Sequence, residues 1–125
     1  MHQVVKSLIF SVSLAGLAAL GFAPLARAAV HDGIWSVLII TEKGGCDRGY
    51  RYEVKVTNGH ITYNGDSGIN LAGTVASDGA TKVSISAGEK GATGTGHLSA
   101  RSGAGIWHGI GASGSCAGRW EAELR

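Results

Sequence analysis

Hydrophobic and polar residues alternate along most of the chain after residue 29. Between positions 50 and 56, tyrosine or valine occupies every even position, and arginine, glutamate and lysine occupy the odd positions between them. A period of two is typical of a strand with one buried face, and helix-type spacing is hard to find in this part of the chain. Asn58-Gly59 follows directly and is a strong signal for a two-residue hairpin turn. The pattern predicts an all-β protein made of hairpins.

The same alternation predicts eight strands joined by short connections. They lie at residues 33–41, 49–57, 60–64, 69–77, 81–87, 92–101, 104–110 and 116–124. Short connections make strands that are neighbours in sequence antiparallel neighbours in space. We therefore expect an eight-stranded antiparallel meander that closes into a small up-and-down barrel. A flattened β-sandwich with a similar strand order is the alternative.

The turns predict which residues face one another. Besides the turn at 58–59, we expect a loop or bulge near Asp78-Gly79, a four-residue loop at 88–91 and a two-residue turn at 102–103. The expected opposite pairs are Val56 with Ile61, Val75 with Val83, Ala87 with Ala92, Leu98 with Trp107, and His97 with His108. In this register, glycines at 73, 94, 96, 105, 109 and 118 share the inner face with the large aromatic side chains. Small residues opposite large ones let a narrow barrel fill its interior.

Residues 1–28 have the features of a secretory signal peptide. Lys6 precedes an almost wholly apolar stretch from residue 7 to residue 22, and Ala26-Arg27-Ala28 is an A-x-A cleavage site. The apolar stretch is at the short end for a membrane span. We expect cleavage after Ala28, which leaves a single β-barrel domain at residues 29–125. The mature protein is expected to be periplasmic or secreted, and not inserted in a membrane.

The two cysteines fit an exported protein. Cys46 follows the first predicted strand, and Cys116 begins the last one. In an oxidising compartment a disulfide is the default for such a pair, and the absence of a C-x-x-C spacing disfavours zinc. If the first and last strands pair antiparallel, the bridge joins the barrel at its seam.

Charge and motifs exclude several function classes. Removal of Lys6 and Arg27 leaves the basic residues equal in number to the nine acidic ones, so net charge gives no support for binding nucleic acid or anionic membranes. The glycine-rich stretch at 91–96 lacks the following helix of a phosphate-binding loop, and residues 111–115 do not match a nucleophile elbow. We therefore predict a protein without enzymatic activity or cofactor, and a small hydrolase is the least favoured alternative.

Several motifs recur in one known group of proteins. They are Gly33-Ile34-Trp35, Cys46-Asp47-Arg48, Tyr50-Arg51-Tyr52, Gly105-Ile106-Trp107 and Cys116-Ala117-Gly118-Arg119-Trp120. With them, residues 32–125 resemble small exported proteins of unknown function found in alphaproteobacteria, especially the rhizobial group. The resemblance implies export and a compact β fold, and it supplies no catalytic residues.

Two kinds of binding site are compatible with this pattern. An open barrel mouth near Trp35, Tyr50 and Trp120 is a candidate site for a small ligand, and Asp47 either caps a turn there or helps to hold the ligand. The outer face of the first strand carries an apolar stripe, which consists of Ile34, Leu38 and Ile40. Such a stripe favours a protein partner or a homodimer contact. The reverse facing of this strand would bury the stripe instead.

A metal site is a further hypothesis. If His97 and His108 are opposite each other on the outer face, their imidazoles are close enough to bind Zn²⁺ or Cu²⁺ together. Only two ligands are apparent, whereas structural zinc takes four. The leading prediction therefore remains a non-catalytic binding module for an unidentified ligand or protein partner. The alternative is an inhibitor of an envelope or host hydrolase that acts through its loops.

Overall fold

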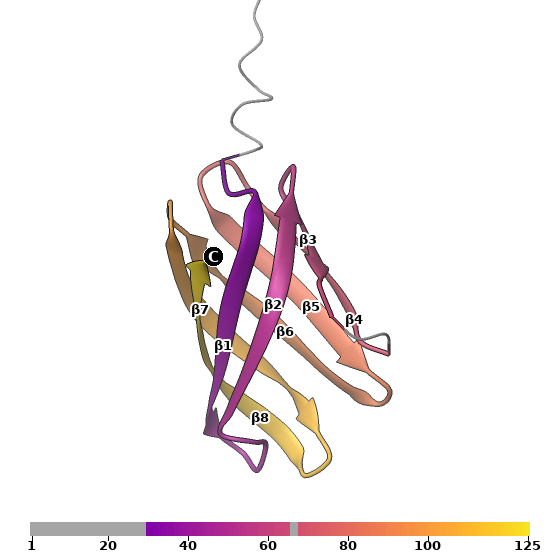
Figure 1. Ribbon diagram of the computed structural model, residues 1–125. Helices are drawn as coiled ribbons and strands as arrows, with labels where there is room; N and C mark the ends of the chain where they lie inside the picture. The colour runs from indigo at the N-terminus through magenta and orange to yellow at the C-terminus, as the bar shows by residue number, and fades with distance from the viewer. Residues whose placement is uncertain (1–29, 66–67) are drawn as a thin grey trace, which may run out of the picture.

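Eight antiparallel strands follow one another around a closed barrel (Figure 1). They are β1 (Gly33–Lys43), β2 (Gly49–Thr57), β3 (His60–Tyr63), β4 (Asn70–Val75), β5 (Ala80–Ala87), β6 (Lys90–Leu98), β7 (Ser102–Gly111) and β8 (Gly114–Leu124). The computed structural model describes residues 30–65 and 68–125. The up-and-down barrel predicted from the alternation is confirmed, and the sandwich is excluded. The expected signal peptide at 1–28 lies outside the described residues.

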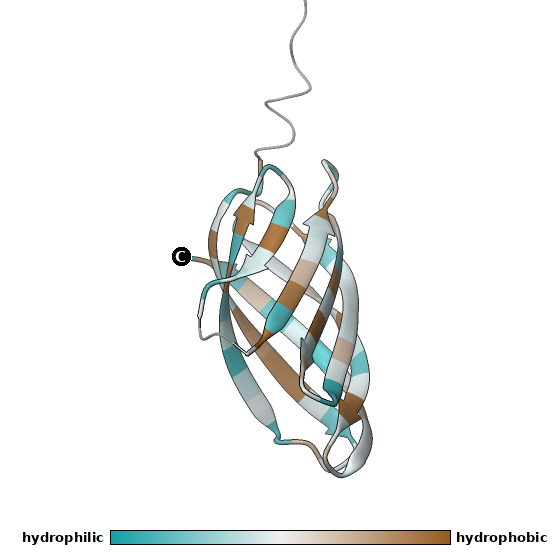
Figure 2. Cartoon of the chain, turned by 90° about the vertical axis from the view of Figure 1, so that its right-hand side faces the viewer, coloured by the Kyte–Doolittle hydropathy of each residue, from teal (hydrophilic) through white to brown (hydrophobic). Residues whose placement is uncertain are grey.

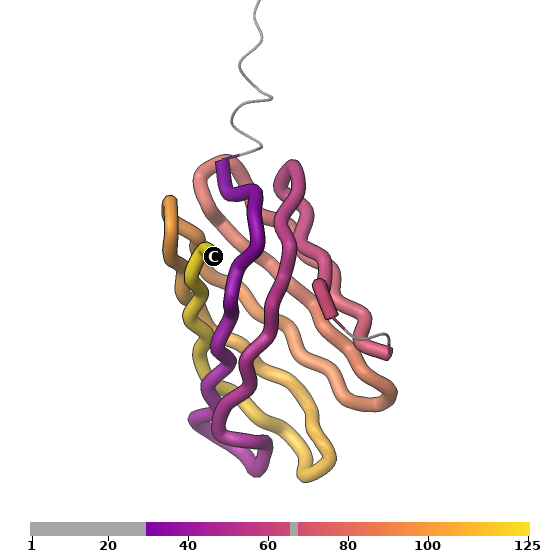
Figure 3. Tube along the Cα trace, in the orientation of Figure 1, coloured from indigo at the N-terminus to yellow at the C-terminus, as the bar shows by residue number. Residues whose placement is uncertain are grey.

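The strands connect at two ends of the barrel. The β2–β3, β4–β5 and β6–β7 connections lie at the same end as the start of β1, at the top in Figure 1. The β1–β2, β3–β4, β5–β6 and β7–β8 connections lie at the opposite end, here called the disulfide end. The chain trace in Figure 3 shows the same succession of hairpins. Within the described ranges, no helix is long and apolar enough to cross a membrane.

The β2–β3 hairpin has the predicted register. Val56 is opposite Ile61, and the two turn residues, Asn58 and Gly59, have φ angles of 51° and 79°. Asparagine and glycine tolerate this left-handed conformation, which matches the twist of the flanking strands. Local turn chemistry therefore determines this hairpin.

Three other predicted registers are wrong. Val75 is opposite Thr81, Ala87 is opposite Lys90, and Leu98 is opposite Gly103. The β5–β6 turn contains only residues 88 and 89, since Gly88 adopts a φ of 65° and closes the hairpin early. Each observed register is shifted from the predicted one by an even number of residues. Every side chain therefore keeps its predicted face.

The β6–β7 error has a steric cause. Gly103 is not in the predicted turn but lies within β7, and the loop is at 99–101, where Ser99 N donates to Ser102 O at 2.6 Å across its ends. A Cβ atom at Gly103 would overlap the side chain of Leu98. This glycine is therefore present because of close packing and not because of a turn.

The inner face has the predicted composition. Trp35 is only 1% exposed, and Val37 and Ile39 pack against the core from the same face of β1. This excludes the reverse facing of the first strand. Figure 2 shows the alternation of hydrophobic and hydrophilic residues along the strands. The buried hydrophobic residues are Trp35, Val54, Val56, Ile61, Val75, Leu98, Trp107, Cys116, Trp120 and Ala122.

Glycines make room for Trp120. Cβ atoms added at Gly96 and Gly105 would overlap the indole, and one added at Gly94 would lie 3.5 Å from its Nε1. The indole Nε1 donates a hydrogen bond to Thr95 O at 3.2 Å. The glycine pattern of β6 and β7 thus serves the burial of one large side chain.

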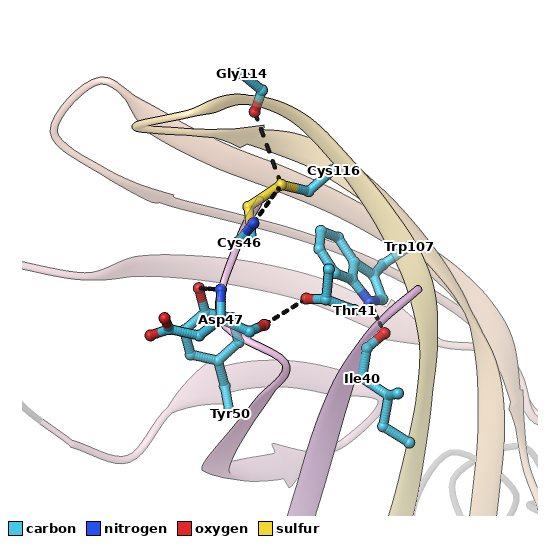
Figure 4. The surroundings of a disulfide bond; sticks show 8 residues. All are labelled: Ile40, Thr41, Cys46, Asp47, Tyr50, Trp107, Gly114 and Cys116. Carbon is cyan, nitrogen blue, oxygen red and sulfur yellow. Dashed lines mark hydrogen bonds between the residues drawn. A yellow bond between two sulfur atoms is a disulfide. The ribbon is translucent and has the colours of Figure 1, made fainter. Parts of the chain in front are cut away.

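The barrel closes where β1 pairs with β8. Their register runs from Trp35 opposite Leu124 to Lys43 opposite Ala117, with a bulge between Thr41 and Lys43. The predicted disulfide, Cys46–Cys116, is present, and its Cα atoms are 6.1 Å apart. It ties the β1–β2 loop to the start of β8 (Figure 4).

Replacement of both cysteines by alanine is expected to destabilise the protein by about 4 kcal/mol. In the chain-entropy model, this is the effect of removing a crosslink between residues separated by 70 positions. Urea unfolding of both proteins, followed by tryptophan fluorescence, measures the difference. Equal unfolding free energies would contradict a stabilising role for the bridge.

Gly105→Ala is expected to destabilise the barrel by about 1–3 kcal/mol because the added methyl overpacks the interior. The new Cβ would lie 2.6 Å from Cε2 and Nε1 of Trp120. Gly91→Ala is the matched control, since its Cβ would meet nothing closer than 3.4 Å. Urea unfolding midpoints should fall for the first variant and stay within a few tenths of a kcal/mol of wild type, or rise, for the second. The reverse order would refute the packing argument.

Candidate functional site

The barrel interior contains a cavity of about 310 Å³ at the disulfide end. It lies among the C-terminal part of β1, the N-terminal part of β2, the β5–β6 hairpin and the facing part of β7. Its larger hydrophobic lining residues are Ile39, Tyr50, Tyr52, Val54, Ile69, Leu71, Val83, Ile85, Trp107, Ile110 and Trp120. The volume is at the lower end of the range for small-molecule sites, roughly 300–1,000 Å³.

Small side chains explain why the interior is hollow at this end. On β6 the lining positions include Gly91, Ala92 and Gly94, and Ala87 ends the opposite strand β5. Ala92 cannot reach across the barrel, and the glycines add no side chain at all. At the other end of the barrel, Trp35 occupies the interior and is almost fully buried. Large side chains therefore fill one end of the barrel, and small side chains leave the other end partly empty.

Both tryptophans of the cavity wall have satisfied N–H groups. The Trp107 Nε1 donates to Ile40 O at 3.0 Å, and the Trp120 Nε1 donates to Thr95 O at 3.2 Å. Their indoles thus contribute apolar surface and need no hydrogen bond from a ligand.

Three tyrosines form a row on β2 and β3. The Tyr50 and Tyr52 rings stack with centroids 6.2 Å apart, and the Tyr63 ring meets Tyr52 edge-on at 6.0 Å. The Tyr50 hydroxyl accepts a hydrogen bond from Asp47 N at 3.2 Å. Within residues 30–65 and 68–125, the Tyr52 hydroxyl has no hydrogen-bond partner, although Tyr52 lines the cavity. This phenol is a polar group in an apolar surrounding.

Burial raises the pKa of the Tyr52 phenol above its ordinary value, and the neighbouring Tyr50 and Tyr63 add to the increase. The neutral phenol is therefore the form that the folded protein favours, and it can both donate and accept a hydrogen bond.

Among the described residues, Lys90 is the one charged side chain that lines the cavity. It begins β6 and is opposite Ala87, on the same strand face as Ala92. Lys90 is solvent-exposed and forms no ion pair with another described residue. The rim of the cavity therefore carries a positive charge.

The predicted ligand residues divide between the two ends. Tyr50 and Trp120 line the cavity as expected. The expectation that Trp35 shares the same mouth is wrong, because Trp35 lies at the opposite end and its Nε1 donates to His31 O at 2.9 Å. Asp47 shapes the β1–β2 loop through its backbone, since its carbonyl accepts from Thr41 Oγ1 at 2.6 Å. Figure 4 shows the Asp47 carboxylate on the side away from Trp107.

The outer stripe of Ile34, Leu38 and Ile40 is half-buried rather than exposed. Ile106 and Ile110 on β7 are 67% and 60% exposed, but β8 lies between β7 and β1. In the row that joins Ile40 to Ile106, the intervening residue is Arg119, whose guanidinium lies 3.8 Å from Glu42 and 3.9 Å from Glu121. The stripe therefore does not extend to β7 as one apolar patch.

The register removes the basis of the histidine metal site. His97 is opposite Ala104, whereas His108 is opposite Thr93, whose hydroxyl lies 3.2 Å from His108 Nε2. The predicted juxtaposition depended on a turn at 102–103 that does not form. Among the described residues, no group of three or more His, Cys, Asp or Glu side chains is arranged to hold a metal ion.

Sequence reasoning missed Lys90, Ile85 and Ala92 as cavity residues. The signal was available in the run of small residues from Gly91 to Gly94, in which Gly91 is predicted to be in a loop and Gly94 to make room for aromatic side chains. Comparison of the chain with family models, curated proteins and solved structures gives no match.

The raised pKa of Tyr52 predicts a pH dependence of stability. Because the folded-state pKa is above the unfolded one, the contribution is fully present below the ordinary tyrosine pKa of about 10 and is lost as the pH rises through the folded-state value. Wild type should therefore lose stability more steeply than Tyr52→Phe above about pH 10. Urea unfolding of wild type and Tyr52→Phe at a series of pH values at and above about 10 measures this difference. Parallel curves of unfolding free energy against pH would contradict the prediction.

Proposed function

We propose that the protein is an exported, non-catalytic binding module that holds a small, mostly apolar molecule in the cavity at the disulfide end. The observation that carries this proposal is an apolar cavity of about 310 Å³ lined by Tyr52, whose hydroxyl has no hydrogen-bond partner among the described residues. A ligand with one hydroxyl or carbonyl group would satisfy this phenol and would cover the hydrophobic walls. Few, well-placed polar groups on an apolar wall are typical of small-molecule sites.

The cavity volume limits the size of the ligand. An apolar protein cavity of about 150 Å³ is enough for benzene. A cavity of about twice that volume has room for a bicyclic compound or an alkyl chain of about ten non-hydrogen atoms. Export agrees with the Cys46–Cys116 bridge, since disulfides persist in oxidising compartments.

Naphthol, a bicyclic alcohol of suitable size, is expected to bind the mature protein in a calorimetric titration. Ala92→Leu should weaken this binding roughly tenfold or more, since the larger side chain occupies the cavity and displaces contacts worth about 1.4 kcal/mol. The matched control is Ala104→Leu, which makes the same change at an exposed position on the outer face of β7. It should bind naphthol as wild type does.

Far-ultraviolet and near-ultraviolet circular dichroism confirm that each variant is folded. If Ala92→Leu does not fold, Ala87→Leu makes the equivalent change at the rim, where the strand ends. The proposal is wrong if naphthol does not bind wild type, or if the cavity variant and Ala104→Leu bind it equally well.

A further inference from the structure

We propose that the natural ligand is an amphipathic monocarboxylate, with its hydrocarbon part in the cavity and its carboxylate at Lys90. This inference rests on the proposed function and specifies the chemical class of the ligand. It combines three features of one site, namely apolar walls, the neutral phenol of Tyr52 in the lining and the ammonium group of Lys90 at the rim.

Lys90 lies at the rim, where it lines the cavity and also borders a second hollow that Glu89 and His108 line. Inner and outer residues alternate along β6, and Lys90 shares its face with Ala92 and Gly94, which both line the cavity. Its antiparallel partner, Ala87, also lines the cavity and is too small to cover it. The aliphatic stem of a lysine can extend the hydrophobic wall while its ammonium group stays in water.

The nearby acidic residues do not neutralise this position. Glu89 precedes Lys90 in the β5–β6 turn and lines a neighbouring hollow with it, whereas neither Glu89 nor Asp47 lines the cavity. No described carboxylate is within ion-pair distance of Lys90. An anionic group that reaches the rim therefore meets a cation that no described carboxylate of the cavity lining neutralises.

Chain length and head group together select the ligand class. The cavity accommodates about ten non-hydrogen atoms, so an alkyl or aryl carboxylate of this size places its tail among residues such as Ile85 and Leu71. A carboxylate accepts hydrogen bonds only, which suits the Lys90 ammonium, a group that only donates. A dication or a sugar would find neither charge complementarity nor enough polar partners on these walls.

Octanoate and octanol are the probes, since they share a hydrocarbon chain and differ in the head group. Wild type is expected to bind octanoate about two- to fivefold more tightly than octanol in low-salt calorimetry, the range for an exposed ion pair. Lys90→Gln should remove this preference by weakening octanoate binding about two- to fivefold, without change for octanol. Lys90→Glu should weaken octanoate binding further, and added salt should reduce the preference of wild type.

Lys82→Gln is the matched control. Lys82 is an exposed lysine on the neighbouring strand β5, on the outer face opposite Thr74 and Thr95, and it does not line the cavity. The Lys82→Gln substitution changes the net charge by the same amount as Lys90→Gln. It should leave the affinities for octanoate and octanol unchanged.

The possible outcomes separate the two proposals. If naphthol and octanol bind but octanoate binds no more tightly, the cavity is a binding site and the carboxylate inference is overturned. The inference is also overturned if the two lysine variants weaken octanoate equally, because the effect is then one of net charge. If neither naphthol, octanol nor octanoate binds wild type, the proposed function itself fails.

Discussion

The pairing of β1 with β8 is the interaction on which the rest of the structure depends. It converts a linear succession of hairpins into a ring without edges, and every inward-facing side chain owes its burial to that closure. The Cys46–Cys116 bridge reinforces the same seam near the point where the ladder is interrupted by a bulge. The disulfide and the β1–β8 hydrogen bonds thus close the barrel at the same seam.

Closure into a barrel also limits how many large side chains the interior can hold. An eight-stranded barrel is just wide enough for side chains to fill it, so the distribution of large and small residues decides where it is solid. Trp35 fills the end that contains the start of β1, and the glycines beneath Trp120 allow the indole to cross the middle. At the disulfide end, Ala87 and Ala92 are too small to fill the interior. The solid core and the cavity therefore lie in different halves of one barrel.

The disulfide connects these two roles. Cys46 is both half of the seam and part of the cavity wall, and the loop that holds it is ordered by contacts to β1 and β2. The backbone of Asp47 contributes these contacts, through Thr41 Oγ1 and the Tyr50 hydroxyl. Tyr50 is thereby fixed against Tyr52, whose ring stacks on it at the cavity wall. The crosslink that stabilises the fold also positions one side of the proposed site.

The sequence by itself determined the strands, the faces of their side chains, the disulfide and the β2–β3 turn. These features follow from a period of two and from local turn chemistry, and even the three wrong registers preserved the inner and outer faces. Outside the β2–β3 hairpin, only the tertiary structure decided which residues are opposite each other, and so it separated His97 from His108 and Trp35 from Tyr50. It alone revealed the cavity with Lys90 at its rim. The physical reason is that alternation is a property of each strand, whereas a register and an empty volume depend on how distant strands meet.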